Sequence, residues 1–394
     1  MISDFRIKYH SGYNPKVSLL LAAVLIIVMH RCIYPFEPVI DKYENLLVVD
    51  GLLTNIPGNC FVKLSRTYKY DEKPDSVETG ARVMIIDDLG IETQLKEFEA
   101  GVYLPEDTLF AGETGRIYKV QVTTLNGEIL ESTPEELKEP VDIEEIYYEY
   151  LDKGNGIQGL QLYLDTYDSR KKSFYYSWDY EETWEISVPF QSLSEYLPEM
   201  KICYRNSSSR KIFIQSTKEY SDDRIIKYPL FFVGNTTNRL MIKYSVLVRQ
   251  YVLTEKTYEF FSDLKEINEN TGTLFDRTPV ILIGNMINKL YPDKPVLGNF
   301  QISGASEMRI FINRDNLPPQ MNVATEYEFC KADLVSKKNE SFRLDSLLHT
   351  GWIVMDTIYE PDKQDTLIGL ANSRSCFDCT LNGDIVKPDF WNEK

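Results

Sequence analysis

The run of residues that decides the fold is FYYSWDYEETWEI, residues 174–186. In a β-strand, side chains two positions apart lie on the same face. One face of this strand would then carry Tyr176, Trp178, Tyr180, Trp184 and Ile186. Aromatic side chains pack well across neighbouring strands, and the 394-residue chain holds 26 Tyr, 19 Phe and 4 Trp. We therefore expect a protein built mainly of β-sheet.

A series of short strand patterns precedes this run, between residues 46 and 138. They are separated by turn signals, among them Asn126-Gly127, a pair that favours a tight hairpin. About seven strands with regularly spaced turns predict an immunoglobulin-like β-sandwich. Pro134 and Pro140 lie in an acidic stretch at its end.

Residues 139–313 are expected to form a second β domain around the aromatic run. A helical insertion is predicted near residues 254–270. Thr254 would cap this helix, and Tyr258, Phe261, Leu264 and Ile267 recur at helical spacing. The remaining segment, 314–394, is predicted to be rich in loops.

The N-terminal residues have the pattern of an export signal. Basic residues precede an apolar run at 17–29, which is shorter than the roughly 20 residues that cross a bilayer, and Cys32 follows. We expect residues 1–31 to be a signal peptide, Cys32 to be lipidated, and residues 32–45 to form a tether. Arg31 occupies the position where a small residue is usual, so cleavage elsewhere or an uncleaved membrane tail are the alternatives.

Cysteine usage also fits export, because disulfides persist in oxidising compartments. Cys60 opens a predicted strand and is expected to be buried and free. The candidates for two disulfide bridges are Cys203, Cys330, Cys376 and Cys379. Free thiols remain an alternative, as does redox or metal chemistry at Cys376-Phe377-Asp378-Cys379, although no second C-x-x-C accompanies that motif.

Charge and composition exclude several classes of function. Residues 1–31 hold four basic and one acidic residue, so their removal would change the net charge from −17 to −20. Such a surface repels nucleic acid. Only His349 of the three histidines follows Cys32, which disfavours a histidine-based triad or zinc site. We predict no catalytic residue, no metal and no cofactor.

Two neighbouring carboxylates, Glu181 and Glu182, lie within the aromatic run. Adjacent strand residues point to opposite faces, so the two cannot flank one glycosidic bond. Glu182 shares the aromatic face, and Arg249 lies among apolar residues of another strand pattern. We therefore predict a structural ion pair between Glu182 and Arg249.

A set of short motifs follows Cys32 in a fixed order. They are PFEP (35–38), VVDG (48–51), YSWDYEETW (176–184), YSVLVRQY (244–251), PVLGNF (295–300), CFDC (376–379) and KPDFW (387–391). Together they resemble a family of Bacteroidetes outer-membrane lipoproteins catalogued as domain of unknown function four-two-four-nine. The resemblance covers the chain after Cys32.

The resemblance implies an accessory role, since genes of this family typically lie beside those of TonB-dependent receptors. It assigns no catalytic residue. We expect a non-enzymatic lipoprotein of the outer membrane, held there by its lipid anchor, that docks on such a receptor. The ligand stays open, and so does the leaflet, because residues 33–36 carry no acidic export signal. A structural or adhesive envelope scaffold is the alternative, and a carboxylate-based hydrolase is less favoured.

Overall fold

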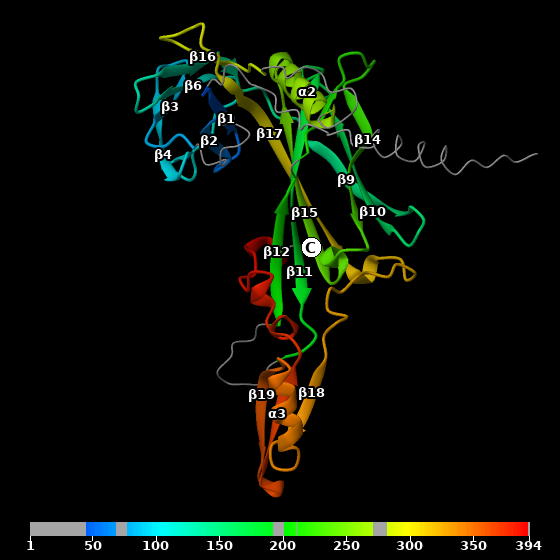
Figure 1. Cartoon of the computed structure of the whole chain (residues 1–394). Helices are drawn as coiled ribbons and strands as arrows, with labels where there is room; N and C mark the ends of the chain where they lie inside the picture. Colours follow the sequence, from blue (N-terminus) through cyan, green and yellow to red (C-terminus); the bar gives the residue numbers. More distant parts are fainter. Residues whose placement is uncertain (1–44, 68–76, 192–200, 210, 271–281, 393–394) are drawn as a thin grey trace, which may run out of the picture. The chain divides into compact units, whose positions relative to one another are not determined.

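The computed structural model of the chain describes residues 45–67, 77–191, 201–209, 211–270 and 282–392 (Figure 1). The predicted signal peptide, Cys32 and the tether up to residue 44 lie outside the described residues. Asn45–Lys394 cluster as one compact unit. Among the described residues, no helix combines the length and the apolar composition that a membrane crossing requires.

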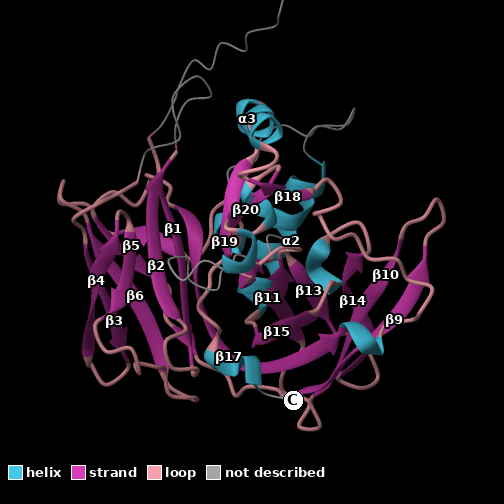
Figure 2. Ribbon diagram, turned by 90° about the horizontal axis from the view of Figure 1, so that it is seen from below, coloured by secondary structure: helices cyan, strands magenta, loops and turns pink. Residues whose placement is uncertain are grey.

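The N-terminal strands surround a core of their own, and Figure 2 shows β1 to β6 gathered side by side. Their bounds are β1 (Leu47–Thr54), β2 (Cys60–Arg66), β3 (Arg82–Asp87), β4 (Glu92–Glu99), β5 (Val102–Pro105), β6 (Ile117–Thr123), β7 (Ile129–Ser132) and β8 (Glu135–Glu136). Alternate residues of β1 and β2, such as Val49 and Val62, pack against Val83 of β3 and Val120 of β6. The mainly β, sandwich-like fold is thereby confirmed.

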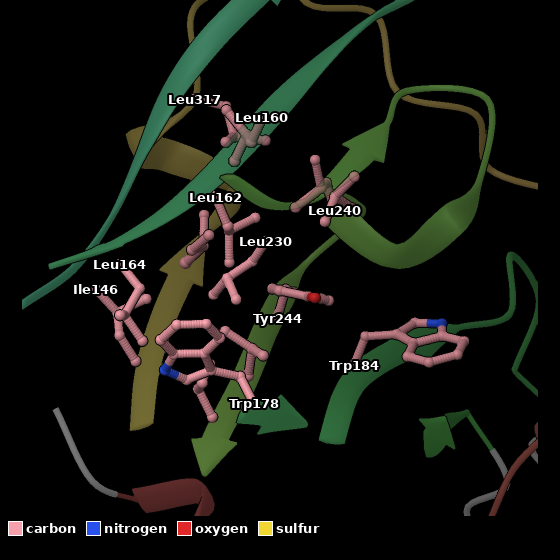
Figure 3. Packing of buried hydrophobic residues seen from close by; sticks show 14 of the residues in the cluster. Ile146, Leu160, Leu162, Leu164, Trp178, Trp184, Leu230, Leu240, Tyr244 and Leu317 are labelled. Carbon is pink, nitrogen blue, oxygen red and sulfur yellow. The ribbon is translucent and has the colours of Figure 1, made fainter. Parts of the chain in front are cut away.

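A second sandwich encloses the largest core. One of its layers is the sheet of β14 (Arg224–Gly234), β10 (Gln158–Tyr167) and β9 (Ile143–Asp152). The other contains β12 (Ile202–Ser208), β11 (Tyr175–Ser187), β13 (Phe213–Ser216) and β15 (Lys243–Val252). Figure 3 shows Leu162, Leu164 and Leu230 of the first layer gathered with Trp178 and Tyr244 of the second.

Strand β17 (Leu297–Asn313) belongs to both sandwiches. Its first half runs parallel to β1, with Val48 opposite Leu297 and Thr54 opposite Ser303. Its second half is antiparallel to β15, from Gly304 opposite Val252 to Asn313 opposite Lys243. Figure 1 shows it as one long strand. The residues expected to belong to a second domain ending at 313 thus include a strand of the N-terminal sheet.

One further strand extends the N-terminal sheet, and one helix packs where the two sandwiches meet. Strand β16 (Met286–Asn288) pairs with β7. Helix α2 (Glu255–Asn270) confirms the predicted insertion. The hydroxyl of Thr254 accepts a hydrogen bond from the backbone N–H of Thr257 at 3.2 Å, which caps the helix as expected. Its Tyr258 and Phe261 pack on Leu52, Tyr251 and Leu253.

The segment 314–394, expected to be rich in loops, also contains a small module of regular structure. It consists of β18 (Ala332–Ser336), α3 (Ser341–His349), β19 (Ile353–Glu360) and β20 (Asp365–Ala371), with β20 at the centre of the sheet. Val335, Ile368 and Leu370 form its core beneath Leu344 and Leu347 of the helix. Short 3₁₀ turns follow, the last at Asp389–Asn392.

Candidate functional site

The predicted ion pair between Glu182 and Arg249 is wrong. In the register of β11 and β15, Arg249 lies opposite Asp179, whereas Glu182 lies opposite Val246. Residues directly opposite each other share a face, so Arg249 lies on the face of Asp179 and Glu181. Glu182 points to the other face. Each predicted residue has a different partner.

Glu182 is buried in the core of the second sandwich, with 3% of its surface exposed. The Tyr244 hydroxyl donates a hydrogen bond to its carboxylate at 2.7 Å, and Arg239 approaches it at 3.4 Å. Burial raises the pKa of Glu182, and the Tyr244 hydrogen bond and the Arg239 charge oppose that rise. Arg239 also lies over the Trp184 ring at 5.3 Å, so its guanidinium contacts both the carboxylate and an aromatic ring of the core.

Arg249 lies at the centre of a charged cluster on the opposite face of the sheet. Its guanidinium is 2.8 Å from Glu181, 3.6 Å from Asp179 and 3.5 Å from Glu307. Although burial acts to lower the pKa of Arg249, the Glu181 hydrogen bond and the surrounding carboxylates raise it. The cluster therefore keeps a permanent positive charge among three acidic groups.

The same face carries a regular grid of polar side chains beyond Arg249. Strand register places Asn206 of β12 opposite Thr183 of β11, and Thr183 opposite Ser245 of β15. Arg309 of β17 lies opposite Leu247, in the row of Glu181. The Thr183 hydroxyl donates to Asn206 at 2.8 Å, and Arg309 donates to Ser245 at 3.1 Å.

The C-terminal turn Asp389–Asn392 packs onto this grid. The Trp391 ring is 3% exposed, and its indole N–H donates to Glu185 at 3.1 Å. The Lys243 ammonium lies 5.2 Å from the Trp391 ring centroid. Beside it, the Arg309 guanidinium lies over the Phe390 ring at 3.6 Å. The turn covers part of the sheet and leaves an open hollow on either side.

The hollow on the side of β12 has a volume of about 460 Å³, and we call it the polar groove. It is lined by Glu181, Glu182, Thr183, Asn206, Ser207, Ser208, Arg309, Pro388 and Phe390, of which Glu182 directs its carboxylate away into the core. The lining offers a carboxylate, an amide, hydroxyls and a guanidinium, with one aromatic ring. Such groups exchange hydrogen bonds with a ligand that carries several hydroxyl or amide groups.

The hollow on the other side of the turn is similar in size. It measures about 490 Å³ and is lined by Glu185, Lys243, Phe311, Asn313, Lys387, Trp391 and Asn392. The strand periodicity of residues 176–186 could have identified the outward face of β11. Nothing in the sequence could have shown that the distant KPDFW motif returns to cover it, because that contact depends on tertiary packing.

Two disulfides use the four cysteines that were predicted, one joining the C-terminal segment to the sandwich and one closing a loop within that segment. Cys203 of β12 is bonded to Cys379, and Cys330 is bonded to Cys376. Cys60 is free and buried, as expected, and burial raises the pKa of its thiol to about 12. Within the described part of the chain, no group of three His, Cys, Asp or Glu side chains is placed to hold a metal ion.

The family model described as "Domain of unknown function (DUF4249)" matches residues 33–309. The match covers most of both sandwiches and ends within β17, before the C-terminal module. No curated protein matches the chain.

Proposed function

The chain belongs to the DUF4249 family, and from this premise we propose that it is a lipid-anchored lipoprotein of the outer membrane. Its role is that of a non-enzymatic accessory subunit, which docks on a TonB-dependent receptor and helps to capture a nutrient. The partner follows from the gene neighbourhood that the family resemblance implies.

The observation that carries the proposal is the position of Cys32. The family match begins at residue 33, directly after this cysteine, and an apolar run at 17–29 precedes it. A mature chain that starts at Cys32 would therefore carry only the lipidated cysteine ahead of the matched region. The disulfides Cys203–Cys379 and Cys330–Cys376 add support, because such bonds persist outside the reducing cytoplasm.

The polar groove supplies a place for the captured ligand. Its volume of about 460 Å³ falls within the range of small-molecule sites. Asn206, Ser208 and Glu181 present donors and acceptors along one side, and Arg309 and Phe390 close the other. We propose a neutral, hydroxyl-rich solute of the size of a small saccharide.

Docking is tested by purification of the tagged protein from outer membranes in mild detergent. A TonB-dependent receptor should be recovered in near-stoichiometric amount. The Cys32→Ala variant is the matched control and should lose the receptor, because it is no longer held at the membrane. Recovery of no receptor with the unmodified chain would contradict the proposal.

Ligand capture is tested separately on the purified chain. A panel of mono- and disaccharides is screened by thermal shift, first with the unmodified protein and then with Asn206→Ala, which removes an amide from the groove. A saccharide should raise the melting temperature of the unmodified protein and not that of the variant. Tyr220→Ala, an exposed site outside the groove lining, should respond like the unmodified protein. Equal shifts for all three proteins would place binding elsewhere.

A further inference from the structure

Five exposed apolar side chains gather at one end of the N-terminal sandwich, where the chain enters β1 from Asn45. We call this the entry end. These residues are Val77, Phe98, Leu125, Leu290 and Tyr291, each between 49% and 75% exposed. Isolated exposed apolar residues are ordinary, but a group of them marks a candidate interaction surface. The opposite end of the sandwich also exposes Leu89, Ile91, Leu109 and Ile117, so the attachment of the N-terminal segment distinguishes the entry end.

Polar contacts show that the loops carrying these residues meet at the entry end. Arg66 donates to the carbonyl of Asn45 at 3.5 Å and pairs with Glu78, the neighbour of Val77. Arg66 also pairs with Glu128 at 2.9 Å, in the hairpin that carries Leu125.

The other two loops are joined in the same way. Glu128 pairs with Lys294, which closes the turn holding Leu290 and Tyr291. The carboxylate of Glu97, beside Phe98, accepts hydrogen bonds from the backbone N–H groups of Gly80 and Gly101.

Four charged side chains at the entry end are paired with one another. Arg66, Glu78, Glu128 and Lys294 form one connected network. Internal pairing lowers the cost of bringing these groups close to a medium of low polarity. Apolar side chains and Tyr291, a residue type enriched at membrane interfaces, are exposed around this network, together with the charged side chains of Glu97, Glu99 and Asp293.

The tether decides which end of the domain is held near the membrane. Thirteen peptide units separate Cys32 from Asn45, and even a fully extended chain of that length spans no more than about 45 Å. An anchor at Cys32 would hold the entry end within that distance of the lipid. Tethering also raises the effective concentration of the bilayer, so a weak contact becomes populated.

We infer that the entry end rests on the lipid bilayer, with Leu125, Tyr291 and their apolar neighbours inserted at the interface. The inference rests on the proposed lipid anchor. It adds a second membrane contact, which would orient the protein on the membrane. The occupant is the lipid surface itself.

The test uses the full lipidated chain in phosphatidylcholine vesicles. A single cysteine replaces Leu125 or Tyr291 and carries an environment-sensitive NBD fluorophore. Cys60 is buried and the four remaining described cysteines are bridged, so labelling is directed to the new thiol. Leu109→Cys is the matched control. Leu109 is as exposed as Leu125, at 75%, and its loop lies at the opposite end of the sandwich, where Gly112 bonds Thr54.

The fluorophores at positions 125 and 291 should show blue-shifted emission and quenching by brominated lipid, while the one at 109 reports water. Vesicle flotation is measured in parallel. If the protein floats but all three fluorophores report water, the lipid contact is refuted and the anchor stands. Shielding that appears only when a receptor is added would also refute it, in favour of a protein occupant. If the chain fails to float, the anchor itself is refuted and this inference falls with it.

Discussion

Tyr244 donates a 2.7 Å hydrogen bond to Glu182 inside the core of the second sandwich. The two residues are 0% and 3% exposed, so water cannot replace a lost partner. A buried carboxylate is tolerated only when it is hydrogen-bonded and paired, and Tyr244 and Arg239 supply those interactions.

We predict that Tyr244→Phe lowers the free energy of unfolding by about 1–3 kcal/mol, because it leaves a buried acceptor short of a donor. Glu182→Gln should cost less, since its amide oxygen can still accept from Tyr244. Urea unfolding measures both. Tyr291→Phe, at an exposed site, is the matched control and should have no measurable effect. Equal losses for Tyr244→Phe and Tyr291→Phe would contradict a role for the buried hydrogen bond.

The raised pKa of Glu182 predicts a pH dependence of stability. The folded state holds this proton more tightly than the unfolded state, whose glutamate titrates at about 4.3. Between the two pKa values the folded state binds more protons, so the contribution of Glu182 to stability falls as the pH rises. Glu182→Gln lacks this contribution. Measured from about pH 4 to pH 7, the variant should gain stability relative to the unmodified chain. Parallel pH profiles of the two proteins would show that the pKa of Glu182 is not raised.

Glu182 and Arg249 lie on opposite faces of the sheet and not in the predicted ion pair, and this difference shows how much of a strand's surroundings a sequence can reveal. The period of two places Glu182 correctly on the aromatic face of its strand, because that property is local. Which face of the next strand meets it depends on register, and register is set by contacts far apart in the chain. The four bridging cysteines could be selected because few other cysteines were available. Their pairing, and the return of Trp391 to β11, depend on tertiary packing.

Gly298 lies in the parallel pairing of β17 with β1, with φ of +86°. A Cβ atom there would come within 1.9 Å of the carbonyl oxygen of Val49. Gly298→Ala should therefore lower the free energy of unfolding by more than about 4 kcal/mol, the range of strained or overpacked sites. Gly127→Ala is the control, since Gly127 has φ of +83° and no atom within 4 Å of that position. It should cost about 1–2 kcal/mol for backbone conformation alone. Similar losses in thermal or urea unfolding would contradict the close approach of the two strands.

The Cys330–Cys376 bond closes the C-terminal module at its base, since it joins residues just before β18 and just after β20. The module's own core is small, with Val335, Ile368 and Leu370. Replacing both cysteines by Ala should destabilise it by up to about 4 kcal/mol in the loop-entropy model. Hydrogen exchange should accelerate in β18–β20 and stay unchanged in β10 and β15. Unchanged exchange in the module would show that its helix and sheet suffice.

Lipidation of Cys32 is the claim on which both the proposed function and the membrane contact depend. Cells are labelled with a palmitate analogue, and the protein is then recovered from the outer-membrane fraction. We predict label on the unmodified chain, in that fraction, and none on Cys32→Ala, which should be released in soluble form. Equal labelling of both proteins, or no label on either, would contradict the account.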